Sequence, residues 1–290
     1  MNRSAGASLV PAMTGRFAGL AWLVAVVAAL WPVWSWSVAR FLDGSDEPWG
    51  IVAIGALAGL TLRDRRLLGA APRAGWLVMA ALLTCAAVMT ATVLPALLRG
   101  VLASLAVTAM LMSLRRDGHT LLPYLMLALL SLPILSSLQF YLGYPLRVIT
   151  AEASAVLLSA TGFDVQRAGS ALSVNGTLVI VDAPCAGIHM AWVAYFTASV
   201  MGAWLHLDAR RFVLQSSCVG LIVIAANVLR NSVLVALESR PQGLSAAWHE
   251  TTGIVVFTFV CVATMWQLGR GHAPRPLVGV RFGSTAGAQQ

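Results

Sequence analysis

Residues 212–234 read FVLQSSCVGLIVIAANVLRNSVL, an apolar run in which Arg230 is the sole charged side chain. A run of about 20 such residues is long enough to cross the ~30 Å hydrocarbon core of a membrane as an α-helix. Similar runs recur along the chain, of which 59% is hydrophobic and only 10% charged, with a mean hydropathy of +0.81. This composition excludes a soluble monomer, and membrane-spanning backbone must satisfy its own hydrogen bonds. The sequence therefore predicts membrane-spanning helices.

We predict an all-α polytopic membrane protein with about eight transmembrane helices. The first run is longer than the apolar core of a secretory signal, so we interpret it as a retained anchor. Residues 1–268 are expected to form a single integral-membrane domain, and residues 269–290 a short cytoplasmic tail. The predicted spans are 17–39, 48–62, 76–94, 97–114, 121–138, 184–206, 212–234 and 249–268.

The net charge of +8 is distributed unevenly across the predicted membrane, and all 19 basic residues are Arg. Alternating the predicted loops places thirteen of these 19 on the side of the N-terminus and the other six on the opposite side. Arg is enriched in cytoplasmic loops, so both termini are predicted to be cytoplasmic. The charge thus reports orientation, and no nucleic-acid partner is expected, because the arginines do not gather on one face.

The segment between the fifth and sixth predicted spans faces the outer side. Apolar residues recur at helical spacing from Pro145 to Gly162, which predicts a short amphipathic helix on the membrane surface. The polar residues elsewhere on this helical wheel are Arg147, Thr150, Glu152 and Ser154. Asn175-Gly176 between residues 172–174 and 177–181 predicts a β-hairpin, because both turn residues tolerate the positive φ of a type I′ turn.

Cys185 opens the sixth predicted span directly after Pro184, which is favoured in the first turn of a helix. We therefore expect Cys185 in the N-terminal turn, where unpaired N–H groups and the helix dipole stabilise a thiolate. Gly187 allows another backbone to come close. The remaining cysteines are interpreted as small apolar fillers and lie in the middle of apolar runs: Cys85, Cys218 and Cys261.

Two further polar groups are predicted at the same outer boundary. Nineteen residues separate Arg211 from Arg230, which corresponds to roughly 29 Å of helix and brings Arg230 to the outer edge of the hydrocarbon. Asn227, Arg230 and Asn231 share one helix face because they are spaced three and four apart. His249 opens the last span on the same side. An ionisable side chain at such a depth is costly and indicates function.

A thiol, a guanidinium and an imidazole together have the chemistry of an acyl-transfer site. The thiolate is the attacking species, and a nearby guanidinium favours it and stabilises an oxyanion. A neutral imidazole takes and returns a proton near pH 7. The sequence does not determine whether Arg230 or His249 activates Cys185. No cofactor is expected.

Two other interpretations use the same residues differently. Cys185, His189, His249 and Asp182 are acceptable zinc ligands, but a zinc site would leave Arg230 beside a cation without a role, so no metal is predicted. Alternatively, the protein is a non-enzymatic transporter or lipid-handling protein in which Arg230 binds an anionic head group.

The three motifs resemble those of the exosortase/archaeosortase family of multi-pass membrane proteins. The chain has Cys185-Ala-Gly187, then Asn227-x-x-Arg230, then His249-x-x-x-Gly253, with one span between successive motifs. The resemblance covers about residues 120–268. It implies that Cys185 is the nucleophile, Arg230 stabilises the thiolate or oxyanion, and His249 is the general acid/base, with Asn227 in support.

The resemblance also implies a substrate and a location. Family members are expected to cleave the C-terminal sorting signal of exported proteins, a PEP-like motif followed by a hydrophobic segment and a basic tail, by acyl transfer. This chain would then be a cysteine protease or transpeptidase of a bacterial inner membrane, in contact with lipid and with its active site facing the periplasm.

Overall fold

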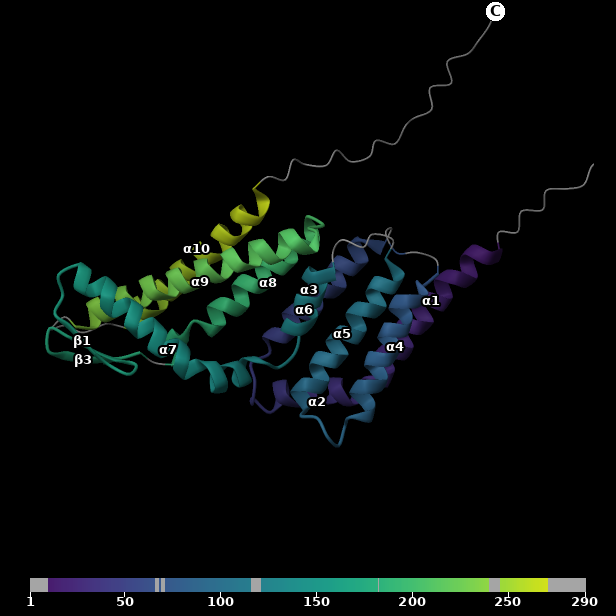
Figure 1. Cartoon of the computed structure of the whole chain (residues 1–290), viewed down its shortest axis with the longest axis horizontal. Coiled ribbons are helices and arrows are strands. Elements are labelled where there is room, and N and C mark those ends of the chain that lie inside the picture. Colours follow the sequence, from purple (N-terminus) through teal and green to yellow (C-terminus); the bar gives the residue numbers. More distant parts are fainter. Residues whose placement is uncertain are drawn as a thin grey trace, which may run out of the picture.

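The computed structural model describes residues 10–65, 68, 71–115, 121–181, 183–239 and 246–270. Within them the chain is mostly helical with one small sheet (Figure 1). The helices are α1 Val10–Ala29, α2 Trp31–Leu42, α3 Trp49–Arg63, α4 Ala74–Met89, α5 Ala96–Leu114, α6 Leu121–Leu130, α7 Leu135–Ala160, α8 Ile188–Trp204, α9 Ala209–Glu238 and α10 Ala246–Gly269. The strands are β1 Val165–Ala168, β2 Ala171–Val174 and β3 Thr177–Ile180. Residues 271–290 of the predicted tail lie outside the described part.

Helix lengths support a multi-pass membrane protein. In the described part, α5, α9 and residues 250–269 of α10 are long and apolar enough to cross a membrane, and counting two bent helix pairs as single spans raises the number from 3 to 5. Each predicted run coincides with a helix or a bent pair, but α3 and α4 have only 15 and 16 residues. The predicted total of eight spans therefore stays a prediction.

The predicted fifth span, 121–138, is wrong as one continuous helix. The chain bends by 93° between α6 and α7, and Pro133 lies in the break. α7 then begins at Leu135 and contains Pro145, which we expected near its start. A carboxylate oxygen of Asp46 accepts the Ser136 N–H at 3.3 Å. This carboxylate comes from 90 residues away and pairs with an N–H in the first turn of α7, which has no acceptor within the helix.

The Asn175-Gly176 hairpin is confirmed. Both residues have positive φ, 49° and 83°, and β2 pairs antiparallel with β3 on either side of them. A strand that we did not predict, β1, pairs antiparallel with β2 and completes the sheet in the order β1-β2-β3. Leu172 and Val174 are fully buried in a cluster that also contains Cys185, so the sheet supports the segment that carries this cysteine.

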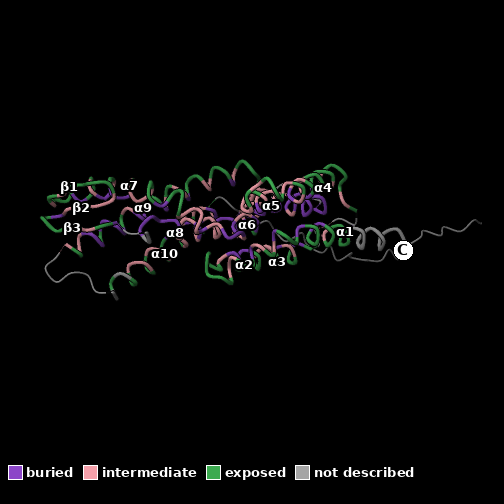
Figure 2. The backbone as a smooth tube through the Cα atoms, turned by 90° about the horizontal axis from the view of Figure 1, so that it is seen from below, coloured by how far each residue is buried: buried purple, intermediate pink, exposed green. Residues whose placement is uncertain are grey.

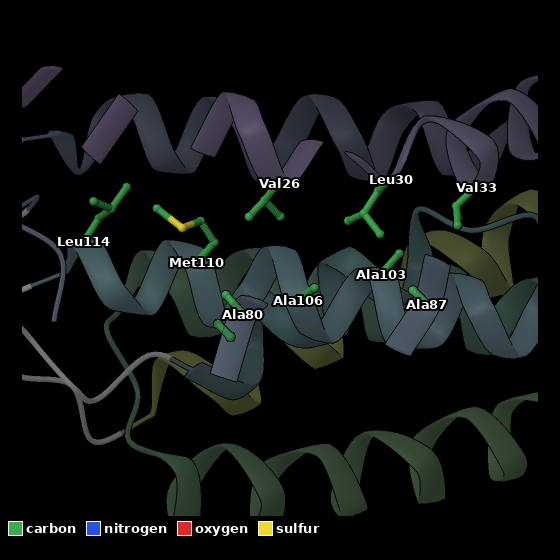
Figure 3. Close-up of a cluster of buried hydrophobic side chains, with 10 residues drawn as sticks. Val26, Leu30, Val33, Ala80, Ala87, Ala103, Ala106, Met110 and Leu114 are labelled. Carbon is green, nitrogen blue, oxygen red and sulfur yellow. The ribbon is translucent and has the colours of Figure 1, made fainter. Parts of the chain in front are cut away.

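A second part of the molecule is packed by small apolar residues. Figure 3 shows side chains of α1 and α2 above those of α4 and α5, with alanines where the lower helices approach. Small residues let helix backbones come close, which stabilises packing in a membrane. In Figure 1 these helices lie at one end of the molecule and α7, α9 and the sheet at the other. Figure 2 colours the backbone by burial: α5 ends in a buried run, residues 108–114, whereas buried and exposed residues alternate along α9.

Contacts at or near the ends of helices form two separate groups. In one group Arg63 Nη1 donates to the carbonyl of Trp204, and Asp64 forms a buried ion pair with Arg115 at 3.3 Å. In the other, Glu47 contacts His189. The groups match the two sides assigned by counting arginines, and which side faces the cytoplasm stays a prediction.

Candidate active site

Cys185 lies in a short 3-10 turn, Ala183–Ala186. Gly187 follows with a left-handed φ of 78°, and α8 begins only at Ile188. The prediction that Cys185 occupies the first turn of the sixth span is therefore wrong, because Gly187 separates that turn from the α-helix. The cysteine is 6% exposed and packs in the cluster under the sheet.

Arg230 approaches this thiol from α9. Its Nη1 donates to Cys185 Sγ at 4.0 Å, and the arginine is 7% exposed. A guanidinium beside a sulfur favours the thiolate over the thiol. The predicted shared face of α9 is confirmed as a buried face, because Asn227 and Asn231 are also buried.

Asn227 connects the cysteine turn to α7. Its Nδ2 donates to the carbonyl of Cys185 at 2.9 Å and to Thr150 Oγ1 at 3.1 Å. A Cβ added at Gly187 would lie 2.9 Å from Asn227 Cγ, closer than real Cβ contacts. Gly187 is thus required both by its positive φ and by the approach of Asn227.

A second hydrogen bond joins α9 to α7 one helical turn further along. Asn231 Nδ2 donates to Ser154 Oγ at 2.9 Å. We call Thr150, Ser154, Asn227 and Asn231 the polar seam between α7 and α9. Thr150 and Ser154 were not predicted to be site residues, and the helical wheel set them apart from the apolar positions. Both are buried, while Ile149 of α7 is 57% exposed, because in a membrane protein an apolar face can point outward.

The third motif lies on α10. A Cβ added at Gly253 would lie 3.9 Å from Arg230 Nη2, so this glycine faces the guanidinium. His249 precedes Gly253 by four residues in the same helix and therefore lies on the same face, one turn earlier. The side chain of His249 lies outside the described residues, and so its predicted approach to Cys185 stays a prediction.

A cavity of about 570 Å³ adjoins this group, and we call it the first cavity. Polar side chains of α8, α9 and α10 share its wall with apolar side chains of α3, α8 and α10. A volume of this size accommodates a short peptide segment. Its lining residues are Trp49, Gly187, His189, Met190, Asn227, Arg230, Glu250, Gly253, Ile254, Phe257 and Thr258.

His189 also faces the first cavity, and a residue that we did not predict holds it. Glu47, from the loop before α3, has Oε1 2.7 Å from His189 Nε2. The described residues contain no group of three or more His, Cys, Asp or Glu suited to a metal. The zinc interpretation also needs Asp182 and the His249 side chain, which lie outside the described residues.

The structure thus brings Cys185, Arg230, Asn227 and Gly187 together. Thr150 and Ser154 could have been found from their spacing of four residues, which matches that of Asn227 and Asn231 across the helix interface. Glu47 had no such signal, since it contacts His189 from 142 residues away.

Comparison with known protein families matches the chain to the model described as transmembrane exosortase over residues 36–266. Searches of curated proteins and of solved structures give no match. The family match begins well before the region in which we found the motifs, and it includes most of the N-terminal helices. The chain therefore belongs to the transmembrane exosortase family.

Proposed function

We propose that the protein is a membrane-embedded cysteine protease or transpeptidase that cleaves the C-terminal sorting signal of exported proteins by acyl transfer. Membership of the exosortase family supports a transmembrane transpeptidase-type role. The observation that carries the cysteine mechanism is the 4.0 Å contact between Arg230 Nη1 and Cys185 Sγ beside the first cavity. The alternative, an anion-binding transporter, gives this thiol no role.

In the first half-reaction, Cys185 Sγ attacks the scissile carbonyl carbon and forms a tetrahedral oxyanion. Arg230 stabilises the thiolate or that oxyanion, and His249 protonates the leaving nitrogen. The C–N bond breaks, the C-terminal segment leaves, and a thioester remains on Cys185. Asn227 supports the reaction through the Cys185 carbonyl, and its Oδ1, buried without a partner in the described part of the chain, accepts from a substrate N–H.

The proposed substrate is an exported protein with a PEP-like motif, a hydrophobic segment and a basic tail. Its hydrophobic segment crosses the bilayer, so its motif reaches the membrane boundary at the depth of Cys185. Holding the two reacting groups together there supplies much of the catalysis. We assign residues 1–268 to one membrane domain of a bacterial inner membrane, with both termini cytoplasmic and the site facing the periplasm.

The test is processing of a model substrate, a reporter that ends in such a motif, hydrophobic segment and basic tail, in cells that express the protein. We expect Cys185→Ala to abolish cleavage while the protein still accumulates in the membrane. The matched control is Cys218→Ala, because Cys218 is exposed on α9 and should be dispensable. Cleavage at the normal rate by Cys185→Ala would contradict the proposal and favour a non-enzymatic role.

A further inference from the structure

A second cavity, of about 480 Å³, lies next to the first. It is formed by the loop between α2 and α3 together with the start of α7. His189 lines both cavities, so they meet at this side chain. The lining residues of the second cavity are Gly44, Ser45, Asp46, Glu47, Leu135, Ser136, Gln139, Phe140 and His189.

The His189 ring is held in place from two directions. Its Nε2 lies 2.7 Å from Glu47 Oε1, and the ring packs against Trp49 at 5.8 Å between centroids. A carboxylate at Nε2 favours the neutral tautomer with its proton on that nitrogen, which leaves Nδ1 as the basic atom. An imidazole oriented by a carboxylate is the arrangement that general bases use.

The second cavity is acidic. Its wall contains the carboxylates of Asp46 and Glu47, and Arg40 pairs with Asp46 at 4.0 Å and offsets one of these negative charges. Asp43 stands in the same loop, and hydrogen bonds from the Ser45 hydroxyl and N–H hold its pKa below the ordinary value. Negative charge of this kind attracts a cationic amine. The first cavity is lined by a cation, Arg230 beside the thiol, and by a carboxylate, Glu250.

We propose that His189 is the general base of the second half-reaction and that the second cavity admits the acceptor, a primary amine. This inference rests on the proposed function, since it requires the thioester on Cys185. The bound ammonium first gives one proton to solvent, and the neutral amine nitrogen then attacks the thioester carbonyl while His189 takes the second proton. The new C–N bond forms, the C–S bond breaks, and the thiolate of Cys185 is released.

Two imidazoles then serve two half-reactions. His249 handles the proton of the leaving segment, and His189 handles that of the incoming amine. Each substrate then has its own cavity, so the acceptor binds in the second cavity and does not have to enter the position that the leaving segment occupied. Glu47 acts through His189 and is therefore a positioning residue.

The experiment uses the full chain in lipid vesicles with p-nitrophenyl acetate as the acyl donor and glycinamide as the acceptor. The burst of nitrophenol measures acylation of Cys185, and the steady-state rate measures deacylation. In His189→Gln we expect an unchanged burst. The steady-state rate should fall by about 10²-fold or more, as is typical when a general base is lost. Glu47→Gln should lower the rate by about 10-fold. His206→Gln, just beyond the opposite end of α8, should change neither phase.

Hydroxylamine distinguishes loss of the general base in His189→Gln from damage to the structure of the active site. It attacks thioesters without help from a base, so it should restore turnover in His189→Gln to near the wild-type rate. Loss of the burst in His189→Gln, or an unchanged steady-state rate, would overturn the role of His189. If the wild-type steady-state rate does not depend on the concentration of glycinamide, water is the acceptor, and the proposal that the acceptor is a primary amine is wrong. Absence of a Cys185-dependent burst in the wild-type protein would instead contradict the proposed function itself.

Discussion

Where α4 packs against α5 most of the buried side chains are alanines, whereas where α7 packs against α9 they include hydrogen-bonded hydroxyl and amide side chains. Packing between alanines requires that the helices approach closely, but it does not require any side chain to point in a particular direction. The polar seam depends on direction, because each hydrogen bond needs a donor aimed at an acceptor. The difference indicates that the α4–α5 region holds the fold, while the polar seam holds the geometry of Cys185.

Among the residues that surround Cys185, Arg230 is expected to have the largest effect on function when it is replaced. Arg230→Met keeps much of the buried volume but removes the charge beside Cys185 Sγ, so processing of the model substrate should fall by about 10³-fold, as when an oxyanion-stabilising group is lost. Membrane accumulation and the melting temperature (Tm) should stay near wild type. An equally large loss of accumulated protein would show that Arg230 is needed for folding.

Gly187→Ala tests the site without touching a reactive group. The new Cβ would meet Asn227 Cγ at 2.9 Å and would stand at a φ of 78°, so the cysteine turn must shift. A displacement of about 1 Å lowers rates by about 10²-fold. We expect that loss in processing rate, measured beside Gly55→Ala, whose added Cβ meets nothing within 4 Å. Equal rates for the two variants would contradict the close fit.

Ala106→Leu tests the other side of the comparison. Ala106 is fully buried, and the larger side chain overpacks the contact between α4 and α5 at a cost of about 1–3 kcal/mol in the free energy of unfolding. Tm should fall, whereas processing per folded molecule should not change. A changed rate per folded molecule would mean that the α4–α5 contact also determines the geometry of the site.

Among the changes close to Cys185, the substitution of Thr150 should lower processing least. Thr150→Val removes the acceptor for Asn227 Nδ2 while keeping the shape, and we expect processing to fall by about 10-fold, corresponding to one lost hydrogen bond. Thr150→Ser retains the hydroxyl and should restore most of the rate. If both variants behave alike, the hydroxyl does not position Asn227.

Local sequence signals predicted the parts of the molecule that depend on neighbouring residues. Asn175-Gly176 predicted its turn because the two residues themselves adopt positive φ, and the spacing of Asn227 and Arg230 predicted their shared face because helix geometry determines it. The order of the three motifs predicted the family. In the described part, the structure brings two of the three predicted catalytic side chains into contact.

Contacts across long sequence distances could not be predicted in this way. The start of α7 depends on Asp46, and the orientation of His189 depends on Glu47, which are 90 and 142 residues from their partners. Thr150 was assigned to the wrong environment because a helical wheel assumes polar residues face water. Pro133 was a visible signal for the break after α6, and it was outweighed by the apolar run around it.

The central claim is that Cys185 forms a covalent bond to the substrate. The most direct measurement is mass spectrometry of acid-quenched, protease-digested protein from cells that process the model substrate. We predict that the N-terminal part of the substrate is joined as a thioester to the peptide containing Cys185. Cleavage without such an adduct, or an adduct on Cys85, Cys218 or Cys261, would contradict the account.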